Sequence, residues 1–283
     1  MQPPTSVSTK RVLFATDFSD HSTAALPYAM SLACTPGGKL VVAHVVAMGP
    51  LRAGFPAHAW LAVSAQGVRE ARALMQHMAE RLNGVEHQTL VRSGDVCGGI
   101  SAMIRDESID VLVLGTHGRT GIRKAVFGSV AEKLFRHARC PVLTIGPNVS
   151  TDPRGVEELH SILYPTDFSE EAQAALGYAL SLAREHRARL YLLHVTKAGR
   201  DWDKAFLEKQ LHDMAPAEAD LACEPKALVR TGSAGQVILD VAKELAVDLI
   251  VVGPKHRSGM PGTMATAYQV VTQASCPVLT VRG

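Results

Sequence analysis

Short apolar runs alternate with longer segments of helical composition along this chain. Val12–Ala15 is a short apolar run, and Leu40–Val46 is a continuous β-branched run, the pattern of a strand buried on both faces of a sheet. Strands that alternate with helices predict right-handed βαβ units and a mainly parallel sheet covered by helices on both sides. Further predicted strands are Gln88–Arg92, Asp110–Leu114 and Val142–Ile145, and further predicted helices are Ala62–Leu82, Val96–Glu107 and Ser129–His137.

The first helix is predicted to follow the turn Asp17-Phe-Ser-Asp20 and to continue through Ala33. A side-chain oxygen of Ser19 or Asp20 can accept a free N–H of the first turn and so cap the helix. Pro27 falls inside this helix and is expected to bend it, because proline removes one backbone donor.

A long, partly apolar insertion, Ala47–Ala65, precedes and overlaps the helix predicted over Ala62–Leu82. We expect the insertion to be a lid or a contact surface. In the helix, Leu74, Met78 and Leu82 are predicted to form one apolar stripe.

The second half of the chain repeats the first. Six segments match in the same order, at offsets that shrink from 150 to 136 residues, which indicates a duplicated domain with a shorter second copy. The polar, Pro- and Gly-containing stretch between the copies is typical of a linker. We therefore predict a first domain over 9–147, a linker over 148–158 and a second domain over 159–283. The clearest matches pair Phe14–Ser19 with Tyr164–Ser169, Leu26–Ala33 with Leu176–Ala183, and Cys140–Ile145 with Cys276–Val281.

The composition indicates a globular chain with a balanced surface. Of 283 residues 47 % are hydrophobic, and 29 basic against 27 acidic residues give a net charge of +2. This balance argues against nucleic acid and against an acidic membrane surface as partners. No apolar run is long enough to span a bilayer or to form a signal peptide. Five dispersed cysteines without CxxC spacing fit a reducing compartment, so we expect a cytoplasmic protein.

The strongest candidate for chemistry follows the fourth strand of the first copy: Gly115-Thr-His-Gly118, then nine residues, then Gly128-Ser129. Ligands bind at this carboxyl edge of a parallel sheet. Gly115 and Gly118 permit positive φ and leave no Cβ between backbone amides and a phosphate, and Gly128-Ser129 opens a helix whose free N–H groups attract an anion. On spacing alone, phosphate binding and simple turn geometry are equally good interpretations. The basic residues of the intervening loop are Arg119, Arg123 and Lys124.

Ala15-Thr-Asp17 ends the first strand and is expected to lie beside the loop after the fourth strand. An aspartate there can accept hydrogen bonds from ribose hydroxyls or from an adenine amino group. The alternative is that Asp17 caps its own helix, although Ser19 and Asp20 are available for that role.

The other candidate residues have structural interpretations. His44 and His194 lie at equivalent strand positions and are expected to be hydrogen-bonded core histidines, not metal ligands. Cys140 and Cys276 each precede proline and an apolar strand, so we expect buried structural thiols. His117, in the glycine-rich loop, is the histidine placed to reach a phosphate or metal. No residue is predicted to be catalytic.

Together these segments resemble the universal stress protein family, as a tandem protein whose first domain is of the ATP-binding type. The resemblance implies two Rossmann-like α/β domains, akin to the adenine nucleotide α hydrolases, each an open five-stranded parallel sheet of order 3-2-1-4-5. It implies ATP, with or without Mg²⁺, at the point where strands 1 and 4 diverge. By the same resemblance, the binding residues are Thr16, Asp17 and Val45 at adenine and ribose, Leu114 and Gly115 at the ribose side, and Gly118, Arg119, Gly128, Ser129 and Val130 at the phosphates.

The second copy departs from this pattern. It reads Gly253-Pro-Lys-His256 in place of Gly115-Thr-His-Gly118, and Met264-Ala265 in place of Gly128-Ser129. The proline removes an amide donor, and the histidine side chain fills space that a phosphate needs. We therefore expect the second copy to bind ATP weakly or not at all.

Three classes of function stay open. The favoured class is an adenine-nucleotide-binding regulatory protein of the stress response, whose ligand shifts its conformation or associations. The second is an ATPase or a nucleotidyl-transferring enzyme, since the fold also resembles that of adenylate-forming and electron-transfer flavoprotein relatives. The missing general base and pyrophosphate-binding Ser-Gly-Gly loop argue against this class and leave at most a slow ATPase. The third is a structural pseudo-dimer without nucleotide. Since the last strands of two domains pair in this family, the two copies are expected to pair within one chain; the sequence leaves homodimerisation and protein partners open.

Overall fold

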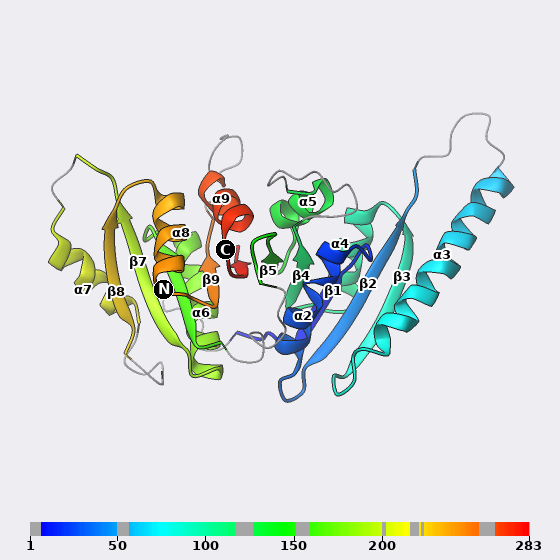
Figure 1. The fold of residues 1–283 in the computed structure, drawn as a ribbon, viewed down its shortest axis with the longest axis horizontal. Coiled ribbons are helices and arrows are strands. Elements are labelled where there is room, and N and C mark those ends of the chain that lie inside the picture. The colour runs from blue at the N-terminus through cyan, green and yellow to red at the C-terminus, as the bar shows by residue number, and fades with distance from the viewer. Residues whose placement is uncertain are drawn as a thin grey trace. The chain divides into compact units, whose positions relative to one another are not determined.

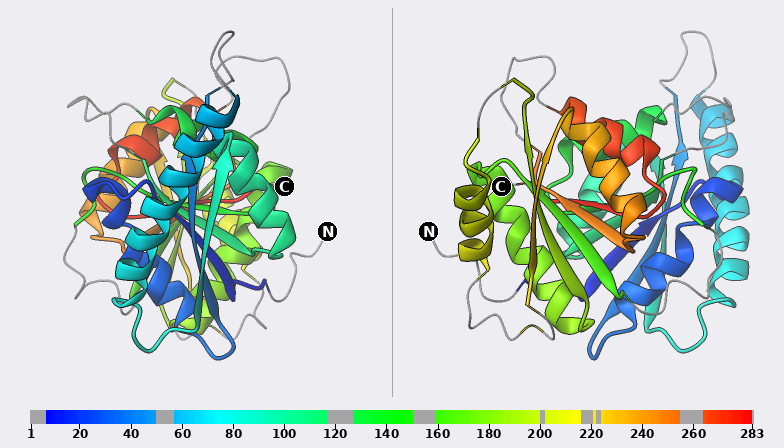
Figure 2. Two further views of the ribbon diagram at one scale, coloured as in Figure 1. Left: turned by 90° about the vertical axis from the view of Figure 1, so that its right-hand side faces the viewer. Right: turned by 60° about the vertical axis from the view of Figure 1, so that its left-hand side comes forward.

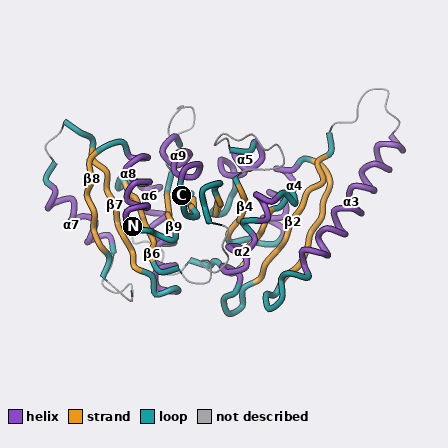
Figure 3. The backbone as a smooth tube through the Cα atoms, viewed as in Figure 1, coloured by secondary structure: helices purple, strands orange, loops and turns teal. Residues whose placement is uncertain are grey.

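The structure is a computed structural model that describes residues 7–49, 57–116, 127–150, 159–199, 202–215, 221, 224–254 and 264–282. Contacts divide the chain into two compact units, one of which is Ser8–Val142 while the other contains Leu143–Gly283. Each unit consists of strands with helices packed against them (Figure 1), and strand and helix alternate along the chain (Figure 3). The predicted α/β class with two repeats is confirmed.

In the first repeat the strands lie in the order β3-β2-β1-β4-β5, which is the expected order 3-2-1-4-5. β1 pairs in parallel with both β2 and β4, and Ala15 lies opposite Leu114 at the carboxyl ends. The strands are β1 (Arg11–Ala15), β2 (Lys39–Ala47), β3 (His87–Gly94), β4 (Val111–Gly115) and β5 (Val142–Ile145). The helices are α1 (Asp20–Thr23), α2 (Leu26–Ala33), α3 (Ala57–Ala79), α4 (Val96–Asp106) and α5 (Ser129–His137).

Helices pack on both faces of β2, which explains why its apolar run is continuous. Val45 packs with Ile100 of α4 in a buried hydrophobic cluster. The next residue, Val46, faces α3, where a Cβ on Gly67 would lie 3.0 Å from Val46 Cγ1. The left view of Figure 2 accordingly shows α3 and α4 on opposite sides of the strands.

The first predicted helix is in fact two helices. α1 ends at Thr23, and α2 begins at Leu26 with Pro27 in its first turn. A proline in the first turn loses no intrahelical hydrogen bond, so the chain breaks before Pro27 instead of bending around it. The second repeat has Gly177 at the equivalent position, and its helix α6 (Glu170–Glu185) is continuous.

The apolar stripe predicted for α3 is correct at two of its three positions, and only Leu74 is wrong. Leu74 is 46 % exposed, whereas its neighbour Met75 is 1 % exposed and buried. Met78 and Leu82 are buried as expected. The helix also begins earlier than predicted, at Ala57, so the second half of the presumed lid is helical; residues 50–56 lie outside the described ranges.

The second repeat has the same strand order, β8-β7-β6-β9-β10. Within the described residues, no helix combines the length and apolarity that crossing a bilayer requires. The strands are β6 (Ser161–Thr166), β7 (Arg189–Thr196), β8 (Lys226–Thr231), β9 (Leu249–Val252) and β10 (Val278–Thr280). The helices besides α6 are α7 (Lys204–Met214), α8 (Ala234–Glu244) and α9 (Ala265–Gln273).

Candidate nucleotide site

A hydrogen-bonded turn after β1 positions Asp17. The carboxylate oxygen Oδ1 of Asp17 accepts from the backbone N–H of Ser19 at 3.0 Å and from its hydroxyl at 2.6 Å. Ser19 Oγ in turn accepts from the amide of Ser22 at 3.2 Å and is the N-cap of α1. The alternative that Asp17 caps the helix is therefore wrong, because Asp17 holds the residue that does.

The same turn holds Phe18 in a strained conformation. Its φ is +63°, a region that bulky side chains rarely adopt. The Phe18 N–H donates to Thr16 Oγ1 at 2.9 Å, and its ring centroid lies 4.5 Å from that of His44. His44 Nδ1 donates to the Thr16 carbonyl at 2.7 Å, since a carbonyl oxygen only accepts. The predicted hydrogen bond of His44 is confirmed, but its side chain is half-buried and not part of the core.

The second copy contains the same turn. Phe168 has a φ of +62°, and its N–H donates to Thr166 Oγ1 at 3.0 Å. His194 Nδ1 donates to the Thr166 carbonyl at 2.9 Å, and its ring lies 4.6 Å from that of Phe168. Because both copies preserve these contacts, the turn belongs to the fold, and it presents Asp17 and Asp167 in the same way.

A cavity of about 580 Å³ opens at the carboxyl edge of the first sheet. It brings together eight of the residues predicted to bind nucleotide, whereas Gly118 and Arg119 lie outside the described residues. The eight are Thr16, Asp17, Val45, Leu114, Gly115, Gly128, Ser129 and Val130. The lining residues that sequence reasoning did not select are Ala15, Ser22, His44, Val46, Ala47, Val96, Ile100, Ala131 and Leu134.

Among the residues that were missed, Ser22 and Ile100 are the most informative. Ser22 Oγ lies 2.9 Å from Thr16 Oγ1 and donates to the Ser19 carbonyl at 3.0 Å, so a buried hydroxyl pair borders the cavity. Ile100 is 2 % exposed and adds an apolar wall from α4. The helical spacing of Ile100 with Met103 and Ile104 marks the buried face of α4, but nothing in the sequence marks Ser22.

The role predicted for Gly115 is corrected by its surroundings. Gly115 is not among the described residues with positive φ. A Cβ at this position would lie 2.7 Å from the carbonyl oxygen of His21, and at Gly253 it would lie 2.1 Å from that of Glu171. Both glycines therefore allow a helix to pack closely on the end of a strand, so packing requires a glycine at this position in each copy, with or without a ligand.

The start of α5 offers backbone amides to the cavity. Its N-cap, Gly128, has no side chain that could accept from them, unlike Ser19 of α1 or Asp95 of α4. The N–H of Gly128 itself donates to the Thr116 carbonyl at 2.8 Å and is therefore not available to a phosphate. What Gly128 offers the cavity is the space that a side chain would occupy. The amides of Ser129, Val130 and Ala131 are the first-turn donors that an intrahelical bond cannot satisfy.

The equivalent cavity of the second copy measures about 230 Å³. Ala172 stands where Ser22 stands in the first copy, and Pro254 stands where Thr116 stands. The N-cap of α9 is Met264, whose buried side chain replaces the bare Gly128. The residues that line this second cavity are Pro165, Thr166, Asp167, Ala172, Leu193, Val195, Ala234, Ile238, Val252, Gly253, Pro254, Thr266 and Ala267.

Burial makes two cysteines, Cys140 and Cys276, unreactive. Cys140 and Cys276 are buried, and loss of solvation raises the pKa of each thiol to about 12. The expected structural thiols are confirmed at both positions. In the described parts of the chain, no group of three or more His, Cys, Asp or Glu side chains is arranged to hold a metal ion.

Comparison with known proteins finds the same family along the whole chain. The sequence profile of the universal stress protein family matches residues 8–146 and again 158–282. Universal stress protein MJ0531 of Methanocaldococcus jannaschii is 31 % identical over 140 residues, covering 48 % of this chain and 81 % of that protein. A universal stress protein of Mycolicibacterium smegmatis is 22 % identical over 294 positions, covering 96 % of both.

A solved structure agrees with these matches. The crystal structure of a universal stress protein from Archaeoglobus fulgidus covers 97 % of this chain and 99 % of its own, with a TM-score of 0.79 at 20 % identity. At that identity the likeness shows the fold, and the two profile matches coincide with the two repeats. The chain therefore belongs to the universal stress protein family and contains two copies of its domain.

Proposed function

We propose that this chain is a stress-response regulatory protein that binds an adenine nucleotide, ATP with or without Mg²⁺, in its first copy only, with little or no turnover. The observation that carries the proposal is the first cavity of about 580 Å³, whose lining includes both Asp17 and the uncapped start of α5. A volume of this size lies within the usual range for small-molecule sites, about 300–1,000 Å³.

The part of the cavity near β1 and β2 suits a nucleoside. Val45, Ile100 and Leu114 supply apolar surface for a planar base. Asp17 is held by the turn described above, and its carboxylate would accept from ribose hydroxyls. The choice of adenine among the bases comes from the resemblance to the ATP-binding type of the family.

The part of the cavity near α5 suits phosphate. The amides of Ser129 and Val130 and the hydroxyl of Ser129 lie at a helix N-terminus, where the dipole favours negative charge. Gly118 and Arg119 lie outside the described residues, and the proposal that they contact the phosphates rests on the sequence pattern alone.

Nucleotide binding is tested by thermal unfolding of the pure protein with and without Mg-ATP, and with GTP as the control for base identity. A free ligand concentration 100-fold above Kd stabilises the folded state by about 2.7 kcal/mol, which raises the melting temperature of a domain of this size by several degrees. Nucleotide released on denaturing the purified protein, detected by absorbance, would show that binding occurs in the cell. No shift with either nucleotide would contradict the proposal.

Release of inorganic phosphate separates a binding protein from an enzyme. A thermal shift with negligible phosphate release supports regulation by binding alone. Sustained release that depends on the first cavity would instead support a slow ATPase. Neither shift nor release would favour the structural pseudo-dimer.

We also propose that the last strands of the two copies pair within one chain. The support is that β5 spans the division between the compact units, since Val142 belongs to the first and Leu143 to the second. Within the second unit, Thr144 Oγ1 donates to the carbonyl oxygen of Val278 at 3.1 Å. Sedimentation of the full chain tests this: a monomer is expected, and a dimer that dissociates only with unfolding would oppose intrachain pairing.

A further inference from the structure

The second cavity keeps the part of the framework that we assign to base and sugar. Thr166, Asp167 and Val195 line it at the positions of Thr16, Asp17 and Val45. Asp167 Oδ1 accepts from the amide of Ser169 at 3.1 Å, as Asp17 does from Ser19, so the carboxylate is presented by the same strained turn.

The end of the second cavity at α9 is altered. Met264 brings a buried side chain to the helix start, and its Sδ lies 3.9 Å from an Arg282 guanidinium nitrogen. Pro254 has no amide donor, and Ala265 has no hydroxyl to match Ser129. The hydroxyl proposed to hold phosphate at Ser129 and the space left open by Gly128 are therefore both missing from the second copy.

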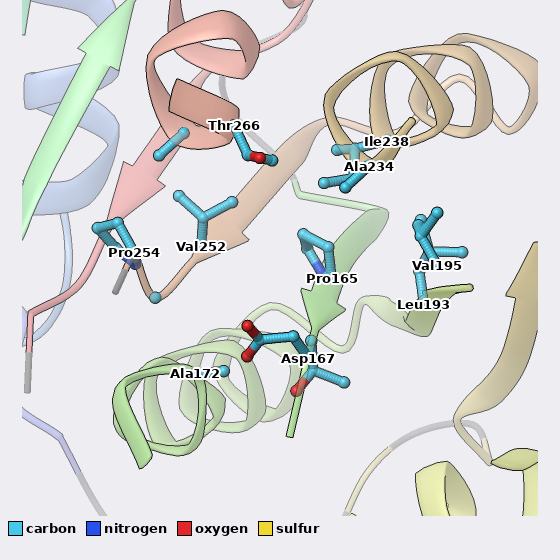
Figure 4. Close-up of a pocket in the computed structure, with 13 residues that line it drawn as sticks. Pro165, Asp167, Ala172, Leu193, Val195, Ala234, Ile238, Val252, Pro254 and Thr266 are labelled. Atoms are coloured by element: carbon cyan, nitrogen blue, oxygen red, sulfur yellow. The ribbon is translucent and has the colours of Figure 1, made fainter. Parts of the chain in front are cut away.

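The size and chemistry of the second cavity favour a small, uncharged ligand. Its volume of about 230 Å³ is less than half of the 580 Å³ of the first cavity. Figure 4 shows apolar side chains, among them Pro165, Val252 and Ile238, around the space, with Asp167 on the α6 side and Thr266 on α9. Such a lining accepts a flat apolar ring, and the Asp167 carboxylate accepts hydrogen bonds from hydroxyl donors.

We propose that the second copy binds a nucleoside without phosphates, of the same base class as the nucleotide of the first copy. This inference rests on the proposed function, because that function identifies the Asp17 end of the cavity as the nucleoside end. The chain then holds a phosphorylated and an unphosphorylated form of one ligand class in two similar domains. It would respond to their ratio and not to one of them alone.

Two substitutions at equivalent positions separate the cavities. Val96 and Ala234 are the first residues of α4 and α8, and each lines the cavity of its own copy. Ala234 is exposed, so Ala234→Trp fills the second cavity from its rim. Val96 is half-buried and packs against the core cluster of the first copy, so Val96→Trp fills the first cavity from the start of α4. Thr266→Trp fills the second cavity from the opposite wall, where Thr266 is also exposed.

Isothermal titration of the full chain with adenosine and, separately, with ATP tests the proposal. We expect adenosine to bind at two sites in the wild type and at one site in Ala234→Trp and in Thr266→Trp. ATP is expected to bind at one site that neither of these variants changes, and a second-copy urea transition like that of the wild type would show that the variants are folded. Val96→Trp should abolish ATP binding and leave the second adenosine site.

The outcomes distinguish this inference from the proposed function. Adenosine binding that survives both second-cavity variants unchanged, or that is absent from the wild type, overturns the inference. Loss of ATP binding in Ala234→Trp would also overturn it, because the second cavity would then take the triphosphate. Adenosine bound only at the second cavity, with no ATP binding anywhere, would leave the inference standing and overturn the proposed function.

Discussion

The two copies share a strand order and a strained turn, yet the first cavity has more than twice the volume of the second. The residues that stabilise the fold are therefore different from those that determine which ligand can bind. The shared set includes Phe18 and Phe168 in the turns. The divergent set lies where α5 and α9 begin, with Gly128 against Met264. Duplication allowed the second set to change while the first set was retained.

A second difference between the copies concerns the buried hydroxyl groups next to the turn. Tyr164 of the second copy donates from its buried hydroxyl to the Ala172 carbonyl at 2.6 Å. The first copy has Phe14 at that strand position, and Ser22 in place of Ala172. Each copy thus buries hydroxyl groups beside its turn, but Ser22 adds a second hydroxyl to the lining of the first cavity, where the second cavity has Ala172.

The largest expected effect comes from the glycines at the ends of the fourth strands. Gly115→Ala and Gly253→Ala should each destabilise their own copy by about 2–3 kcal/mol, because the added Cβ meets a helix backbone that cannot move cheaply. Urea unfolding measures this for each transition. If Gly115→Ala lost ATP binding while its free energy of unfolding stayed the same, Gly115 would serve ligand binding and not helix packing. The conclusion that both copies need this glycine for packing would then be wrong.

The next largest effect concerns the start of α5. Gly128→Met gives the first copy the residue of the second, and we expect ATP affinity to fall about 50-fold, equivalent to about 2.3 kcal/mol. Gly128 has a φ of −60°, which any residue adopts, so the fold should tolerate the change. Titration calorimetry measures the affinity. The reverse change, Met264→Gly, is the control and should leave the ATP affinity of the first copy as it is.

A smaller effect is expected at the turn. Asp17→Ala should weaken ATP binding about tenfold, or about 1.4 kcal/mol, through loss of an acceptor for the sugar. The substitution also removes the support of Ser19. Asp167→Ala removes the corresponding support in the second copy and so serves as the matched control. Equal ATP affinity in the two variants would show that Asp17 does not contribute to ATP binding.

The smallest effect is a change in alkaline stability. Burial raises the pKa of Tyr164 from 10.0 to about 12 in the folded chain. The folded state thus favours the neutral phenol, and its contribution is complete below pH 10 and is lost as the pH rises through 12. Tyr164→Phe should cost about 1 kcal/mol at neutral pH by leaving the Ala172 carbonyl without this donor.

The variant should also lose less stability than the wild type between pH 10 and 12. Unfolding by urea at pH 7 and across that window measures both parts of the prediction. Parallel stability curves for the two proteins would contradict the assigned shift.

Much of the fold could be predicted because its signals are local and repeated. The duplication, the strand order implied by the family and the turn around Asp17 all follow from short segments such as Phe14–Ser19 and Tyr164–Ser169. The burial of Met75 instead of Leu74 in α3 could not be predicted in this way. Leu74 and Met75 are adjacent and both apolar, and only the packed sheet decides which of them faces inward.

The candidate site was predictable as a set of residues but not as a shape. Most of the glycine pattern and Asp17 were identified, yet Ser22 was missed because a serine in a helix is ordinary in a sequence. The role of Gly115 was misjudged because the atoms nearest to it belong to His21, and such a contact between distant segments appears only once the helix is packed. Cavity volume depends on many such contacts.

The close helix approach at Gly115 and Gly253 has a consequence for classifying other duplicated chains of this family. A glycine after the fourth strand is demanded by architecture, so it will persist in copies that have lost their ligand. Surveys that score this position will count inactive copies as competent. The residue that opens the following helix should be the better diagnostic, since it is Gly128 in the first copy and Met264 in the second.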